Sequence, residues 1–193
     1  MKKIIYILLL FLATGSRPAT AQRCIPGQMG MQLSAGLTDG LLLRNRHGAY
    51  TFWADMALVR YNRNRTHWSF GVSLLRKDYP YAGELIPKLQ YTTEAGYYIP
   101  LAASRGRGCI LSAGLSGLAG YERINAGQTV LSDGASLSER GGFIGGGTLA
   151  AELAAFFGDR LALLVTIKER CYFGSTVGNF HTQLGFGIRV TIN

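Results

Sequence analysis

The sequence has 193 residues, a length that suits a single domain, and no Pro- or Ser-rich linker divides it. Its formal net charge is +9 at pH 7, but the basic residues fall in short pairs such as Arg44/Arg46, Arg63/Arg65 and Arg105/Arg107 rather than along one stripe. This spread favours solvated turns and contact with lipid headgroups over nucleic-acid binding, so we expect no direct binding of DNA or RNA.

The first 21 residues have the pattern of a secretory signal peptide. Two lysines precede an apolar run from Ile4 to Ala13, and small residues up to Ala21 form an A-x-A cleavage site. The run is about half as long as the roughly twenty residues that a spanning helix needs. We expect cleavage between Ala21 and Gln22. The mature chain, residues 22–193, then holds 17 basic and 11 acidic residues and forms one domain.

The mature chain divides into eight segments rich in aromatic, β-branched and Gly residues, separated by turn residues. The segments are residues 28–38, 49–61, 66–78, 87–100, 109–123, 142–157, 160–173 and 180–192. None reaches 18 consecutive apolar residues, which excludes helical spans. They are longer than the usual strand of about five or six residues and suit tilted membrane strands of about ten or more.

Apolar residues alternate with small or polar residues along these segments. The pattern is clearest in the last one, where Leu184, Phe186, Ile188, Val190 and Ile192 alternate with Gln183, Gly185, Gly187, Arg189 and Thr191. Segment 160–173 repeats it, with interruptions at Leu164 and Glu169. A period of two predicts strands with one apolar and one polar face.

The connections also alternate in length. Those over 38–48, 79–86, 124–141 and 174–179 are longer on average than those over 62–65, 101–108 and 158–159. Bacterial outer-membrane barrels have long outer loops and short periplasmic turns, and an even strand count returns both termini to the periplasm. We therefore predict an all-β fold, a closed antiparallel transmembrane β-barrel of eight strands, surrounded by outer-membrane lipid.

Aromatic residues gather near the predicted strand ends, where two interface girdles would need them. They include Trp53, Tyr61, Trp68, Tyr97, Tyr98, Phe143, Tyr172 and Phe173.

Charged residues fall on the face that the alternation directs into the barrel. They are Asp55, Glu94, Glu122, Glu152, Lys77, Lys88, Lys168, Arg170 and Arg189. Charges in a narrow lumen are costly unless they are paired, and eight strands leave little room beyond their own side chains. We expect a structural ion-pair network, with a conducting or ligand-binding lumen as the alternative.

The sequence offers little for catalysis, and we expect no catalytic, metal or cofactor site. His181 could be drawn as a triad with Ser175 or Thr176 and with Asp133 or Glu139, but no nucleophile elbow supports it. The glycine-rich stretch 141–147 lacks the GK[ST] of a phosphate loop and fits close strand packing. If any disulfide forms within the chain, the predicted topology permits only the pair Cys24 and Cys109.

Several short stretches resemble the TraO proteins of Bacteroides-type conjugative transposons. They are Gln22–Gly27, Lys77–Tyr81, Ile86–Pro87, Glu94–Tyr98, Leu118–Glu122, Gly142–Ile144, Glu169–Arg170 and Phe180–Gln183. The resemblance covers nearly the whole mature chain. It implies a noncatalytic part in conjugative DNA transfer, as an accessory of the envelope-spanning secretion apparatus with other conjugal transfer proteins as partners.

Two other functions stay open at this stage. One is a general surface or porin-like barrel unrelated to conjugation. The other is a soluble periplasmic, lipocalin-like barrel that binds an apolar ligand. Such a barrel would require the apolar side chains to face inward. The longest connection, 124–141, is our candidate for contact with a partner.

Overall fold

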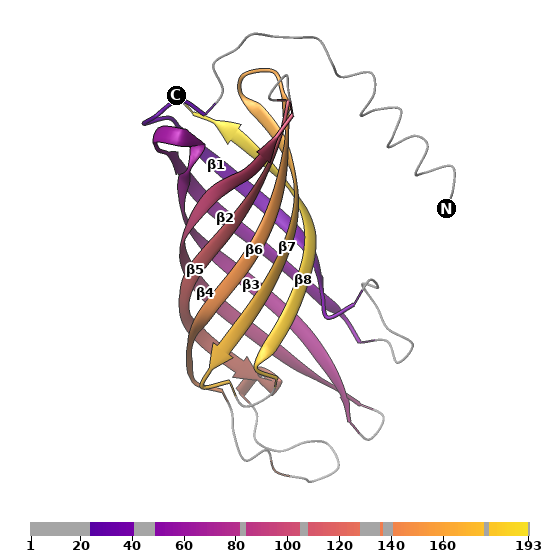
Figure 1. The fold of residues 1–193 in the computed structure, drawn as a ribbon. Coiled ribbons are helices and arrows are strands. Elements are labelled where there is room, and N and C mark those ends of the chain that lie inside the picture. The colour runs from indigo at the N-terminus through magenta and orange to yellow at the C-terminus, as the bar shows by residue number, and fades with distance from the viewer. Residues whose placement is uncertain are drawn as a thin grey trace, which may run out of the picture.

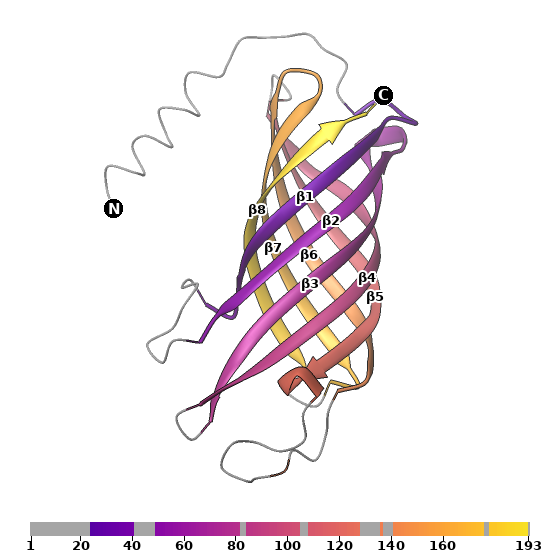
Figure 2. The same ribbon diagram turned by 180° about the vertical axis from the view of Figure 1, so that it is seen from behind.

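The computed structural model describes residues 24–40, 49–81, 84–104, 108–127, 136, 141–175 and 178–192. Its strands are β1 (Met29–Thr38), β2 (Thr51–Tyr61), β3 (His67–Tyr81), β4 (Glu84–Ala103), β5 (Cys109–Ile124), β6 (Phe143–Phe157), β7 (Leu161–Phe173) and β8 (Phe180–Thr191), with short 3₁₀ turns η1 (Arg63–Arg65) and η2 (Asn125–Gly127). Each strand pairs antiparallel with the next, and β8 pairs with β1, so the sheet closes into a barrel (Figures 1 and 2). The predicted eight-stranded closed barrel is confirmed.

Closure matters because backbone N–H and C=O groups find no water inside a hydrocarbon layer. The β1–β8 ladder runs from Gly30↔Thr191 to Thr38↔Gln183, so the first and last strands leave no open sheet edge along this length. Within the described part of the chain, no helix is long and apolar enough to cross a membrane.

The predicted strand limits are close to the observed ones except in the β3–β4 hairpin. The connection predicted over 79–86 is mostly strand, because the ladder continues to Tyr81↔Glu84. This part of the hairpin contains Pro80 and Pro87, and proline cannot donate a ladder hydrogen bond. The β2–β3 ladder ends at Lys77 and the β4–β5 ladder begins at Lys88, so both prolines lie in a two-stranded extension where proline is tolerated.

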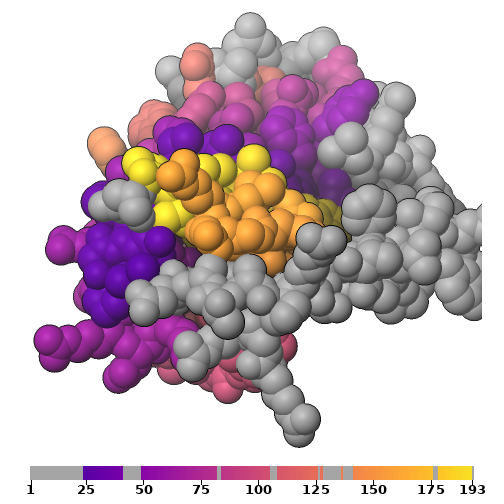
Figure 3. Space-filling model, turned by 90° about the horizontal axis from the view of Figure 1, so that it is seen from above, coloured from indigo at the N-terminus to yellow at the C-terminus, as the bar shows by residue number. Residues whose placement is uncertain are grey.

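The two ends of the barrel differ in what they hold. The terminal end carries residues 24–28, Ile192 and the last residues of β2, β4 and β6, and the loop end carries the last residues of β1, β3, β5 and β7 (Figure 1). Seen from the terminal end, the first described residues (indigo), the β6–β7 turn (orange) and the end of β8 (yellow) lie packed together (Figure 3). The assignment of this end to the periplasm stays a prediction. The cleavage site at Ala21 and Gln22 lies outside the described residues.

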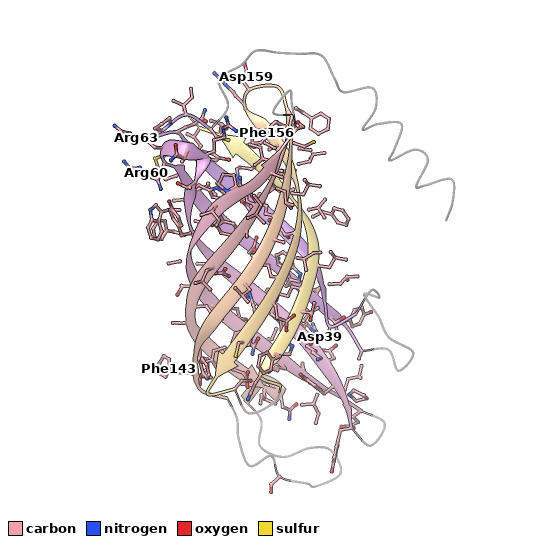
Figure 4. All side chains as sticks on the ribbon, viewed as in Figure 1. Asp39, Arg60, Arg63, Phe143, Phe156 and Asp159 are labelled. Atoms are coloured by element: carbon pink, nitrogen blue, oxygen red, sulfur yellow. The ribbon has the colours of Figure 1, made fainter. Side chains whose placement is uncertain are left out.

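The wall is apolar outside and polar inside, as strand β7 shows. Its odd-numbered side chains from Leu161 to Ile167 are 37–52% exposed, whereas the even-numbered ones from Ala162 to Lys168 are no more than 6% exposed. Figure 4 shows side chains leaving the ribbon on the outside of the barrel in this view. A barrel that carries an apolar ligand in water would need the reverse arrangement.

The prediction of an interface position is wrong for four of the aromatic residues. Trp53, Tyr61, Tyr98 and Tyr172 point into the barrel and are at most 6% exposed. Position near a strand end was the criterion, but parity along the strand decides which wall a side chain joins. Trp68, Tyr97, Phe143 and Phe173 lie on the outer wall, at the ends of their strands or close to them.

Candidate functional site: the charged lumen

The lumen nearest the terminal end is built around Arg189 of β8 and Glu152 of β6. The Arg189 guanidinium donates to both carboxylate oxygens of Glu152 at 2.7 Å, and both side chains are 3% exposed. Arg189 also donates to Gln32 Oε1 at 2.6 Å and to the Tyr61 hydroxyl at 2.9 Å. The charge pair therefore ties four strands, β1, β2, β6 and β8, across the interior.

Two further ion pairs occupy the middle of the lumen. Lys168 Nζ lies 2.5 Å from Asp55 Oδ2 and 5.0 Å from the centre of the Trp53 ring. Arg170 donates to Glu94 Oε2 at 2.7 Å, and the same carboxylate accepts a hydrogen bond from Ser116 at 2.5 Å. Both cations come from β7, and their partners lie on β2 and β4. The two pairs thus cross the interior rather than join adjacent strands.

Lys88, Glu122 and Ser175 form the group closest to the loop end. Lys88 Nζ lies 3.0 Å from Glu122 Oε2, and both side chains are 1% exposed. Glu122 also accepts hydrogen bonds from Gln90 and from the Ser175 hydroxyl, each at 2.7 Å. Lys88 in turn donates to the Ser175 oxygen at 3.0 Å. Ser175, which follows β7, thereby closes this part of the lumen.

Lys77 was placed among the lumen charges, but its contact lies at the loop-end rim. Its ammonium is 2.7 Å from Asp39, a residue that follows β1 and that the sequence analysis did not single out. Asp39 also contacts His181 Nδ1 at 2.5 Å and accepts a hydrogen bond from the backbone N–H of Thr182. Partial burial raises the pKa of Asp39, but hydrogen bonds and positive charge from His181 and Lys77 outweigh it and lower the pKa from 3.8 to about 2.

The triad considered from the sequence is only partly assembled. Asp39 is the carboxylate that holds His181 in the described part of the chain. Ser175 directs its hydroxyl to Glu122, within the Lys88 group. Thr176, Asp133 and Glu139 lie outside the described residues. A signal for Asp39 was present, since it follows the last residue of a predicted strand, but pairing between the first and last strands was needed to place it beside His181.

Paired charges occupy the interior at several levels between the terminal end and the loop end. A cavity between the Arg189 pair and the middle pairs, lined by Gln32, Ser69 and Tyr98 among others, has a volume of about 20 Å³, room for about one water molecule. Inward glycines make room for inward rings, since a Cβ at Gly114 would lie 2.4 Å from the Tyr98 ring and one at Gly185 the same distance from Trp53.

Over the described ranges, no group of three or more His, Cys, Asp or Glu side chains is arranged to hold a metal ion. Among the described residues, Cys24, Cys109 and Cys171 form no disulfide, and Cys24 packs against Val59, Tyr61 and Ile110 at the terminal end.

Comparison with known families relates this chain to conjugative transposon proteins. The family model of the conjugative transposon protein TraO matches residues 25–192. A comparison with curated protein sequences finds no significant match.

Solved structures with similar folds are outer-membrane barrels. Neisserial surface protein A is 10% identical over 86% of this chain and 96% of its own, with a TM-score of 0.59. Ail, the attachment invasion locus protein of Yersinia pestis, crystallised with the heparin analogue sucrose octasulfate, is 11% identical over 86% and 99%, with a TM-score of 0.51. The N-terminal barrel domain of Pseudomonas aeruginosa OprF is 10% identical over 86% and 99%, with a TM-score of 0.50. At such identities the likeness concerns the fold alone.

Proposed function

We propose a function from the premise that this chain belongs to the TraO family of conjugative transposon proteins, whose model matches residues 25–192. The protein is a noncatalytic outer-membrane β-barrel component of a conjugative DNA-transfer apparatus. It is exported by its signal peptide, is embedded in outer-membrane lipid and is a partner of other conjugal transfer proteins. The observation that carries the proposal is the family match over a barrel whose outer wall is apolar.

The lumen supports an anchoring role rather than a conducting one. Ions or DNA passing through the barrel would have to displace the Arg189–Glu152, Arg170–Glu94 and Lys168–Asp55 pairs, which cross the interior. Separating a buried pair leaves uncompensated charge and costs about 3–5 kcal/mol. We therefore assign the charged network a structural role and assign partner binding to the connections at either end. The candidate connection 124–141 lies largely outside the described residues.

A mating assay tests the role in DNA transfer. The gene is deleted from a strain that carries the element and is restored on a plasmid, and transfer frequency is measured for each strain. We expect deletion to lower transfer and the plasmid copy to restore it. The same cells are fractionated, and the protein should remain in the outer membrane after carbonate extraction. Transfer at an unchanged frequency would defeat the conjugation role and leave the barrel intact.

A conductance measurement separates the anchoring role from a porin-like one. The purified barrel in planar lipid bilayers should produce no discrete conductance steps, whereas a known porin in the same bilayers should produce them. Reproducible steps from the purified chain would contradict a closed lumen.

A further inference from the structure

We propose that the terminal end carries a binding site for the headgroup of an anionic phospholipid, formed by Arg60, Arg63 and Arg65 beside the rings of Trp68 and Tyr97. The inference stands independently of any part in DNA transfer, because it rests only on the outer wall and the β2–β3 turn. Figure 4 shows Arg60 and Arg63 extending away from the barrel at the terminal end, opposite to the end that holds Phe143 and Asp39.

The first step is the position of Arg60 on the wall. It faces outward from β2, directly opposite Trp68 of β3, which in turn lies opposite Tyr97 of β4. The Trp68 and Tyr97 ring centres are 4.8 Å apart, and Phe70 stacks on Trp68 at 6.1 Å. Trp and Tyr on an outer wall mark the membrane–water interface. An arginine in the same row lays its apolar stem on the wall and carries its guanidinium to headgroup level.

The second step is a groove formed by the β2–β3 turn. Asn62, Arg63, Asn64 and Thr66 line an open groove of about 590 Å³ together with Trp68 and Tyr97. One side of the groove is polar and cationic and the other is aromatic, which matches a molecule with a charged head and an apolar tail. In the space-filling view, side chains of the segment around this turn (purple) project from the rim (Figure 3).

The turn holds its arginines on a defined backbone. The N–H of Asn62 donates to the carbonyl of Thr66 at 2.8 Å, and the Thr66 hydroxyl donates to the carbonyl of Arg63 at 3.0 Å. Asn64 and Arg65 both have φ of +61°, a left-handed conformation that glycine adopts without cost. The chain nevertheless has an arginine at the second of these positions, where a glycine would relieve the strain. This strained position is consistent with a functional demand for charge.

The third step is the contrast in charge pairing between the two ends. At the loop end, Arg76 pairs with Asp78 at 3.1 Å and Lys77 with Asp39 at 2.7 Å. Among the described residues, no carboxylate lies within 4.0 Å of the guanidiniums at the β2–β3 turn. A phosphate group supplies the missing acceptors, and guanidinium binds it through two parallel hydrogen bonds.

A lipid fits this surface better than a nucleic acid does. A DNA or RNA backbone would satisfy the guanidiniums, but it has no reason to contact Trp68, Tyr97 and Phe70 on a wall that faces hydrocarbon. A phospholipid contacts both parts at once, with its phosphate on the turn and its glycerol and upper acyl chains along the rings. The site therefore selects a net negative headgroup such as that of phosphatidylglycerol over a zwitterionic one.

Spin-label electron paramagnetic resonance measures this selectivity in the full mature chain. The barrel is reconstituted in phosphatidylcholine, and spin-labelled phosphatidylglycerol or phosphatidylcholine is added at low mole fraction. The motionally restricted fraction gives the relative association constant of each lipid. We expect a preference of several-fold for phosphatidylglycerol, falling to near one in the triple variant Arg60→Gln, Arg63→Gln, Arg65→Gln.

A matched variant removes the same charge at the other end. Arg76→Gln, Lys77→Gln, Arg123→Gln should keep most of the preference, and heat-modifiable gel mobility should show a folded barrel for every protein. An equal loss of the phosphatidylglycerol preference in both variants would mean that net charge alone causes it, and would overturn the proposed site. Displacement of the bound phosphatidylglycerol by DNA at physiological salt would assign the arginines to nucleic acid. If spin-labelled lipid A is retained more tightly than phosphatidylglycerol, the arginines bind lipid A, the lipid of the outer leaflet, and the proposed site for a phospholipid is wrong.

Discussion

The two faces of strand β7 are one residue apart and have opposite requirements. Leu163, Val165 and Ile167 are exposed on the outer wall, whereas Lys168 and Arg170 pair with carboxylates on β2 and β4. On the lipid face any apolar side chain of moderate size satisfies the environment. On the lumen face each charge depends on one particular partner. The specificity of this fold therefore resides mainly in its polar interior, the reverse of a water-soluble domain.

The largest expected effect comes from breaking the most buried ion pair. Glu152→Gln keeps the shape of the side chain but removes the negative charge that pairs with Arg189. The Arg189 side chain is only 3% exposed, so water cannot replace the lost carboxylate. We expect a loss of about 3–5 kcal/mol in the free energy of unfolding, measured by urea titration of the folded barrel in lipid vesicles. Glu169→Gln on the outward face of the same barrel is the control, with an expected change within about 0.5 kcal/mol. Equal losses would contradict the distinction between the faces.

A charge placed on the outer wall of the barrel tests whether this wall faces lipid, and its effect should be the second largest. Val165→Arg introduces a charge on the outward face near the middle of β7, where the expected loss is about 2–4 kcal/mol. Phe173→Arg introduces the same charge at the end of the strand, where the loss should be about 0–1 kcal/mol. The same urea titration measures both. A cost that does not depend on depth would mean that this wall is not in hydrocarbon.

Two glycines of β5 compare the faces without adding charge. A Cβ at Gly114 would lie 2.4 Å from the Tyr98 ring, which itself stacks on His67 at 4.9 Å. A Cβ at Gly117 on the outer face meets nothing within 4 Å. We expect Gly114→Ala to cost about 1–3 kcal/mol in unfolding free energy and Gly117→Ala to be nearly neutral. Matching costs would show that Tyr98 does not fill the lumen as described.

The smallest effect concerns the loop-end rim and depends on pH. The pKa of Asp39 is lowered to about 2, so its contacts with Lys77 and His181 stabilise the folded state fully above pH 4 and lose that contribution as the pH falls through 2. The difference in unfolding free energy between the wild type and Asp39→Asn should be under about 1 kcal/mol above pH 4 and should vanish as the pH falls below 2. A difference that stays constant from pH 4 to below pH 2 would assign the effect of the substitution to something other than the carboxylate charge.

Alternation along the chain was sufficient to predict the barrel and the direction of most side chains. A period of two assigns each residue of β7 and β8 to a wall, and Lys168, Arg170 and Arg189 of these strands are at most 6% exposed. The ion-pair partner of each inward charge could not be predicted from the alternation. The pairing of Arg170 with Glu94 depends on how far the strands are staggered around the ring, and no local pattern in either strand records that stagger.

The errors have the same origin. Lys77 of β3 pairs at the rim with Asp39, which follows β1, and no local pattern in either segment records this contact. Tyr172 was assigned to the interface by its nearness to a strand end, although its even number places it beside Arg170 in the lumen. The β3–β4 extension was also missed, and its Pro80 and Pro87 are tolerated there because no third strand extends the ladder at these positions.

The most direct test of the inverted wall is a labelling scan of six consecutive residues, 162–167, in β7. The native cysteines are replaced, single cysteines are spin-labelled in lipid vesicles, and collision rates are measured with oxygen and with a water-soluble nickel complex. We predict high oxygen and low nickel collision rates at Leu163, Val165 and Ile167, and low rates with both reagents at the three even-numbered positions. Nickel access to the odd-numbered positions, or the absence of a period of two, would contradict a barrel with lipid outside and ion pairs within.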